Sequence, residues 1–146
     1  MYPGRRLGAF GPGNQRNMDG YTKVNLRDVE NQAPKFDMPD ELDARFARTP
    51  IEGETLGLSL MKLDPDFRIP FGHKHPDQEE VYVVVRGSGR IKVEDEVVEL
   101  GEWDAIRIDK DTMRNMEAGP NGIEFLAFGS GDDPTDAEME PDWWHD

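Results

Sequence analysis

The sequence predicts an all-β domain, either a sandwich or a barrel. Short apolar runs alternate with turns over most of the chain, and the breaks carry glycine, proline and aspartate, as in "LDPD" (63–66) and "GPNG" (119–122). One helical turn is expected, in "MPDELD" (38–43). The length of 146 residues fits one domain with one hydrophobic core.

The apolar runs that are expected to form strands lie at 22–26, 44–48, 55–63, 80–86, 90–93, 97–100, 105–108, 113–117 and 123–128. Residues 1–20 are rich in Gly, Pro, Asn and Arg and are expected to form an extended arm. Residues 130–146 form a tail that carries Trp143 and Trp144 near its end, two side chains that are costly to leave in water. The tail is therefore expected to pack back onto the domain or onto a partner subunit.

The charge of the chain excludes two classes of partner. Its 31 acidic and 17 basic side chains give a formal net charge of −14, which repels nucleic acid and anionic membrane surfaces. The absence of cysteine excludes disulfides, zinc fingers and thiol nucleophiles. No run approaches the roughly 18 apolar residues of a membrane span. These features together predict a soluble, cytoplasmic protein.

The stretch "FGHKHPDQEE" (71–80) holds two of the three histidines, His73 and His75. Because side chains alternate between the two faces of a strand, residues at i and i+2 point the same way. On the strand that follows, Glu80 and Tyr82 share one face by the same argument. Two histidines and one carboxylate are the ligand set of several iron and zinc sites with open coordination positions. The pattern predicts a metal site at His73, His75 and Glu80, with Tyr82 lining the same cavity.

The segment "GHKHPDQEEVYVVVRGSG" resembles the first motif of the cupins. That motif has two histidines separated by one residue, then a glutamate, then a glycine six residues further on. The spacing matches Gly87 and selects Glu80 rather than Glu79 as the glutamate. The resemblance implies a single cupin domain over residues 1–146. Its core would be a double-stranded β-helix, or jelly-roll barrel, over about 52–129, with N- and C-terminal extensions.

The second cupin motif is altered in this chain. In "WDAIRIDKDTMRN" the spacing is kept, but Trp103, Asp109, Asp111 and Arg114 stand where the family pattern has Gly, Pro, Gly and a histidine ligand. Arginine keeps its positive charge and is not a metal ligand. Arg114 has three alternatives. It pairs with Glu80, or it lies beside a three-ligand metal and grips an anionic substrate, or it lies at the barrel rim in solvent.

The resemblance implies a protein that binds a small, anionic ligand in the barrel cavity, with Arg114 and Tyr82 as ligand-binding residues. The implied cofactor is a divalent transition metal (Fe, Mn, Zn or Ni), or none. If the chain is an enzyme, it is a metal-dependent oxygenase, isomerase or lyase, because one fold hosts many chemistries. No catalytic residue is assigned. The alternative is a non-catalytic binding or assembly module, without metal, whose cavity is closed by an Arg114–Glu80 pair.

A homodimer is also expected. Val81, Val83 and Val85 form an apolar stripe on the strand face opposite Glu80, which the cavity does not need. A second subunit could cover the stripe, since twofold dimers are the commonest oligomers. The alternative is that the N-terminal strands of the same chain cover it.

Overall fold

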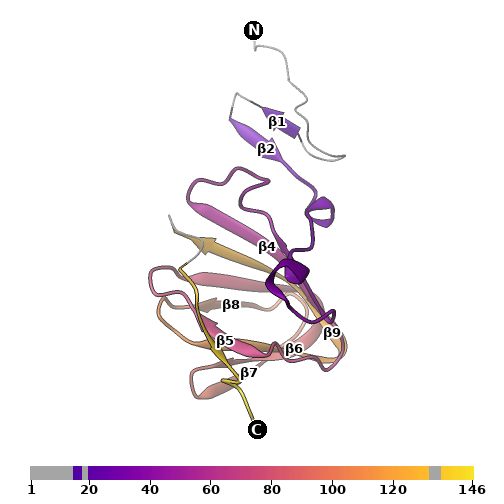
Figure 1. Cartoon of the computed structure of the whole chain (residues 1–146), viewed down its shortest axis with the longest axis vertical. Helices are drawn as coiled ribbons and strands as arrows, with labels where there is room; N and C mark the ends of the chain where they lie inside the picture. Colours follow the sequence, from indigo (N-terminus) through magenta and orange to yellow (C-terminus); the bar gives the residue numbers. More distant parts are fainter. Residues whose placement is uncertain (1–14, 18–19, 132–135) are drawn as a thin grey trace.

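The computed structural model describes residues 15–17, 20–131 and 136–146. In this part of the chain an eight-stranded sheet curls into a barrel, so the predicted all-β fold is confirmed (Figure 1). A separate ribbon of two short strands, β1 (Gln15–Asn17) and β2 (Tyr21–Lys23), lies above the barrel in this view. The rest of the arm predicted for residues 1–20 falls outside the described residues, apart from Gly20. None of the described helices is long and apolar enough to cross a membrane.

The strands of the barrel are β3 (Leu42–Phe46), β4 (Leu56–Leu63), β5 (Phe71–Lys74), β6 (Glu80–Val93), β7 (Glu96–Leu100), β8 (Ala105–Ile108), β9 (Arg114–Ser130) and β10 (Glu138–Pro141). Along one path the order is β10-β5-β9-β4-β3. Strand β6 pairs with β9 and also carries β7 and β8. The pairs are antiparallel, and the two longest strands, β6 and β9, run side by side through the barrel.

The segments "GSG" (87–89) and "GPNG" (119–122), expected to end strands, instead lie within β6 and β9. The register between these strands shifts at Gly87 to Gly89, as at a β-bulge. Gly87 has a φ of 77°, and a Cβ there would lie 2.1 Å from the carbonyl oxygen of Gly122. Only glycine allows this approach of the two backbones. The predicted strands 80–86 and 90–93 are therefore one bent strand, β6, and the predicted strands 113–117 and 123–128 are one bent strand, β9.

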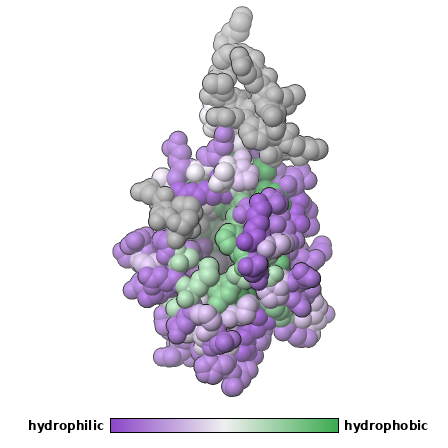
Figure 2. All heavy atoms as spheres, viewed as in Figure 1, coloured by the Kyte–Doolittle hydropathy of each residue, from purple (hydrophilic) through white to green (hydrophobic). Residues whose placement is uncertain are grey.

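The alternation predicted for β6 is confirmed. Tyr82 and Val84 are buried in the core, whereas Val81, Val83 and Val85 are half-buried. The core also contains Leu63, Ile91, Ile108, Met116, Ile123 and Phe125. Figure 2 shows that hydrophobic side chains also reach the surface, in a band flanked by hydrophilic ones. The homodimer through the valine stripe stays a prediction.

The prediction of a helical turn at 38–43 is wrong. The described helical segments are two 3-10 turns, η1 (Leu26–Asp28) and η2 (Ala33–Phe36). Leu42 instead begins β3, opposite Leu63 of β4. Its side chain is buried in the strand pairing, and the hydrophobic core therefore overrides the local helical preference of the segment.

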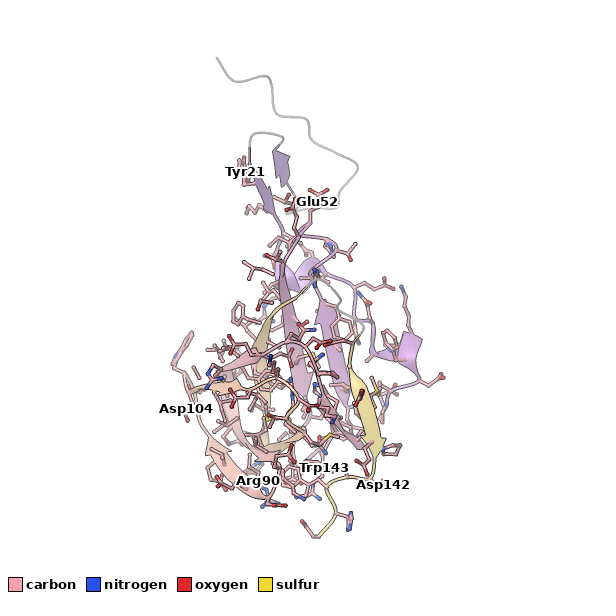
Figure 3. The ribbon with its side chains drawn as sticks, turned by 90° about the vertical axis from the view of Figure 1, so that its left-hand side faces the viewer. Tyr21, Glu52, Arg90, Asp104, Asp142 and Trp143 are labelled. Atoms are coloured by element: carbon pink, nitrogen blue, oxygen red, sulfur yellow. The ribbon has the colours of Figure 1, made fainter. Side chains whose placement is uncertain are left out.

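Of the tail predicted at 130–146, Ser130 ends β9, and residues 136–146 pack onto their own domain, as one of the two alternatives predicted. Here we call these residues the C-terminal segment. Strand β10 pairs with β5, and Trp143 lies so close to Gly72 that a Cβ there would be 2.7 Å from its ring. Trp144 is 6% exposed, with the guanidinium carbons of Arg68 and Arg90 at 4.1 and 5.2 Å from its ring centroid. Figure 3 shows Trp143 and Arg90 at the same end of the barrel.

Candidate metal centre

The structure brings His73, His75 and Glu80 together inside the barrel. His73 lies on β5, His75 follows that strand directly, and Glu80 begins β6. The Nε2 atoms of His73 and His75 are 3.7 and 3.3 Å from Oε1 of Glu80. One potential ligand atom from each residue lies within 4.8 Å of the others. Glu79, which the motif spacing rejected, lies on the surface beside Arg107.

Two further residues complete a hydrogen-bonded cluster around the carboxylate. The Tyr82 hydroxyl donates to Oε1 of Glu80 over 2.9 Å. Arg114 is opposite His73 in the pairing of β9 with β5, and its Nη2 donates to the same oxygen. Its Nε donates to the Tyr82 hydroxyl over 3.0 Å, and its Nη1 donates to the carbonyl of Thr112 over 3.0 Å.

Arg114 is therefore an interior residue. It is 1% exposed, so the alternative that placed it at the rim in solvent is wrong. It makes the pair with Glu80 that the sequence left as one alternative, and it uses three of its five N–H groups on protein acceptors. The alternative of an anionic ligand on Arg114 would use the remaining N–H groups or displace one of these contacts.

The backbone supports the alignment of the altered second motif. Trp103 and Asp111 occupy the two positions where the cupin pattern has glycine, and their φ values are 67° and 59°. This left-handed region favours glycine, so the fold keeps the glycine conformation without the glycine. The Asp111 amide donates to the His75 carbonyl over 2.8 Å, which ties the second motif to the first.

The two histidines differ in their electrostatic surroundings. Burial disfavours the charged ring of His73 and, with the nearby charge of Arg114, lowers its pKa despite the contact with Glu80. Burial acts in the same direction on His75, but the carboxylates of Glu80 and Asp136 outweigh it and raise the pKa of His75. His75 is thus the ring that more readily holds a second proton.

Asp136 was not anticipated from the sequence. Its Oδ1 lies 2.7 Å from Nδ1 of His75 and accepts a hydrogen bond from Nε2 of Gln78 over 2.8 Å. Nothing in the acidic stretch "SGDDPTDAEMEP" distinguishes this aspartate from its neighbours, and it is 61 residues from His75 along the chain. The third histidine, His145, lies on the surface, with Nδ1 2.9 Å from the Asp142 carbonyl oxygen.

The residues present suit a divalent transition metal. Two imidazole nitrogens and a carboxylate oxygen form an established donor set for such ions. The side chains of His73 and Glu80 are 26% and 14% exposed, so the group is in contact with solvent. The charge of Arg114 opposes a second cation, but it does not remove any of the three donors.

Glu80 is expected to make the protein sensitive to acid. Burial alone would raise the pKa of its carboxyl, but contacts with His73 and His75 and the charge of Arg114 hold it well below its usual range. The carboxyl of a glutamate in an unfolded chain has a pKa of about 4.3. Ionised Glu80 therefore contributes stability above that pH, and the contribution is lost as the pH falls below it.

The variant Glu80→Gln is expected to flatten this acid dependence. It should be less stable than the wild type at neutral pH, yet lose less stability between about pH 5 and about pH 3, because the titrating carboxyl is gone. Urea unfolding across that range measures the difference. Glu79→Gln removes a neighbouring, exposed carboxyl and is the control. Parallel pH curves for the wild type and Glu80→Gln would refute the assignment.

Comparison with known proteins agrees with the fold and the first motif. Residues 59–121 match the family model of the cupin domain. The crystal structure of a cupin protein from Bacteroides fragilis is similar, with 24% identity and a TM-score of 0.64, over 77% of this chain and 86% of that one. The barrel, the histidine motif and these matches support a cupin domain in this chain, with the family match confined to residues 59–121.

Other solved structures share the fold at lower identity. KdgF from a Halomonas species is 19% identical over 64% of this chain and 83% of its own, with a TM-score of 0.53. Oxalate decarboxylase from Bacillus subtilis is 20% identical over 88% of this chain, with a TM-score of 0.68, but the match spans 34% of that longer protein. No curated protein matches the chain.

Proposed function

We propose that the chain binds a divalent transition metal at His73, His75 and Glu80, and through this centre a small anionic ligand. The observation that carries the proposal is the convergence of these three donors, within 4.8 Å of one another, from β5, the residue after it and the start of β6. A bound metal would supply a Lewis acid with open coordination positions. The donor set suits Fe, Mn, Zn and Ni.

Arg114 changes the charge and the number of ligands at this centre. It stands where the cupin pattern has a fourth ligand, and it directs a fixed positive charge at the carboxylate that a metal needs. Two cations close to one carboxylate repel each other, so the affinity for the metal is lower than in a four-ligand site. The same charge favours an anionic ligand next to the metal, where Tyr82 offers a further polar group.

The test is a titration of the metal-free protein with Zn²⁺ and Mn²⁺. We expect sub-stoichiometric metal after purification of the wild type, and at least about tenfold tighter binding by Arg114→His, which removes the charge and adds a ligand. His75→Ala should abolish binding, and His145→Ala, at the surface histidine, is the control that should not change it. Full occupancy of the wild type after chelator washing would contradict the weakening by Arg114. Failure of both the wild type and Arg114→His to bind would contradict the metal centre.

A second candidate function is favoured by the contact between Arg114 and Glu80. In that case the pair replaces the metal, the cavity is closed, and the barrel is a non-catalytic binding or assembly module. The hydrogen bond from Tyr82 to the same carboxylate oxygen supports this alternative, because it helps to satisfy the carboxylate without an ion. The titration separates the two candidates, since a closed module binds neither metal at any concentration that leaves the fold intact.

A further inference from the structure

The C-terminal segment reaches the centre through one side chain. Asp136 precedes β10, and β10 pairs with β5 so that Met139 is opposite His73. This pairing places Asp136 beyond the end of β5, where His75 lies. Its side chain is 10% exposed, and Nδ1 of His75 is 2.7 Å from its Oδ1.

The carboxylate of Asp136 is itself held in place. Gln78 donates to Oδ1 over 2.8 Å, and the Asp77 amide donates to Oδ2 over 3.4 Å. Both donors belong to the loop between β5 and β6 that carries His75 towards Glu80. The contact with His75 is therefore one of three that fix this carboxylate, rather than an isolated surface contact.

The contact determines which nitrogen of His75 is available. A neutral imidazole has one N–H and one lone pair, and a carboxylate beside Nδ1 places the proton there. The carboxylate of Glu80 lies further from the ring, 3.3 Å from Nε2, than that of Asp136, 2.7 Å from Nδ1, so the single proton of the neutral ring stays on Nδ1 and the lone pair lies on Nε2. Within the described residues, His73 has no carboxylate at Nδ1, so the two histidines are supported differently.

We propose that Asp136 is a positioning residue for the centre. Through Nδ1 it holds the His75 ring in the tautomer and orientation that direct the lone pair of Nε2 towards the point shared with the donor atoms of His73 and Glu80. The C-terminal segment, whose strand β10 is at one end of the barrel sheet, is then part of the centre, although it contributes no ligand. The consequence for metal affinity rests on the proposed function, whereas the tautomer of His75 does not.

The experiment uses the full chain with Asp136→Ala and Asp136→Asn. Nitrogen NMR of the imidazole of His75, in the metal-free protein at alkaline pH where the ring is neutral, reports the tautomer directly. We expect the Nδ1–H form in the wild type and a shift towards the Nε2–H form in Asp136→Ala. Zn²⁺ titration of the same samples should show a loss of affinity of about 10–100-fold, as for other groups that orient a ligating histidine. Asp136→Asn keeps the shape of the side chain and should fold even if the alanine variant does not.

Glu138→Ala is the matched control, because Glu138 is an acidic residue of the same segment that contacts Lys74 at the surface. It should change neither readout. If the wild type binds Zn²⁺ and neither Asp136 variant changes the tautomer or the affinity, the positioning role is overturned and the proposed function stands. If neither the wild type nor Arg114→His binds Zn²⁺, the proposed function fails, and the tautomer alone decides. A shift in Asp136→Ala then supports the positioning role, and an unchanged tautomer overturns it.

Discussion

Replacing Arg114 with alanine is expected to lower the free energy of unfolding by about 3–5 kcal/mol, the cost of breaking a buried ion pair by removing one partner. The change leaves the carboxylate of Glu80 without its cation in the interior. It also removes the donors to the Tyr82 hydroxyl and to the Thr112 carbonyl. Chemical denaturation of the metal-free protein at neutral pH measures the loss.

Arg107→Ala is the matched control for this prediction. Arg107 also contacts two carboxylates, those of Glu79 and Asp109, but its side chain is 56% exposed. Exposed ion pairs contribute about 0–1 kcal/mol, so this variant should be close to the wild type. Equal stability losses for Arg114→Ala and Arg107→Ala would show that the buried Arg114–Glu80 pair contributes no more to the free energy of unfolding than an exposed pair.

Trp144→Ala is expected to cost about 3 kcal/mol or more, the range for removing a buried tryptophan. The variant also loses the stacking of the Arg68 and Arg90 guanidinium groups on the indole ring. Because Trp144 anchors the C-terminal segment, the pairing of β10 with β5 should loosen at the same time. Thermal unfolding measures the first effect, and hydrogen exchange of the β10 amides measures the second.

Trp103→Ala serves as the comparison, since Trp103 is 73% exposed and should contribute little. A loss confined to the β10 amides, with an unchanged melting temperature, would mean that the C-terminal segment folds onto the barrel as an independent unit. Such a result would contradict the cooperative anchoring expected here.

Much of the fold could be predicted because the sequence pattern is local. The alternation in β6 predicts which valines face outward, and the turn residues mark where the chain changes direction. What could not be predicted depends on contacts between distant segments. The close approach of Gly87 to Gly122 lets the chain continue as a bent strand at two places where the sequence predicted that a strand ends. Strand β10 forms because it can pair with the edge of β5.

The same distinction applies to the centre. His73, His75 and Glu80 could be predicted as a group because strand periodicity and motif spacing both operate over a few residues. The position of Arg114 followed from the spacing of the second motif, but excluding the barrel rim needed its burial and the register of β9 with β5. Asp136 could not be predicted, because it reaches His75 through a strand pairing with no sequence pattern of its own.

The most direct test of the account is a crystal structure with anomalous data from crystals soaked in Mn²⁺. The account predicts a partially occupied anomalous peak between Nε2 of His73, Nε2 of His75 and the carboxylate of Glu80, and a stronger peak at the same place in Arg114→His. The contrary result is no peak in either crystal at Mn²⁺ concentrations that saturate a reference manganese protein, with Arg114 still bound to Glu80 in the wild type. That outcome would show that the ion pair has replaced the metal.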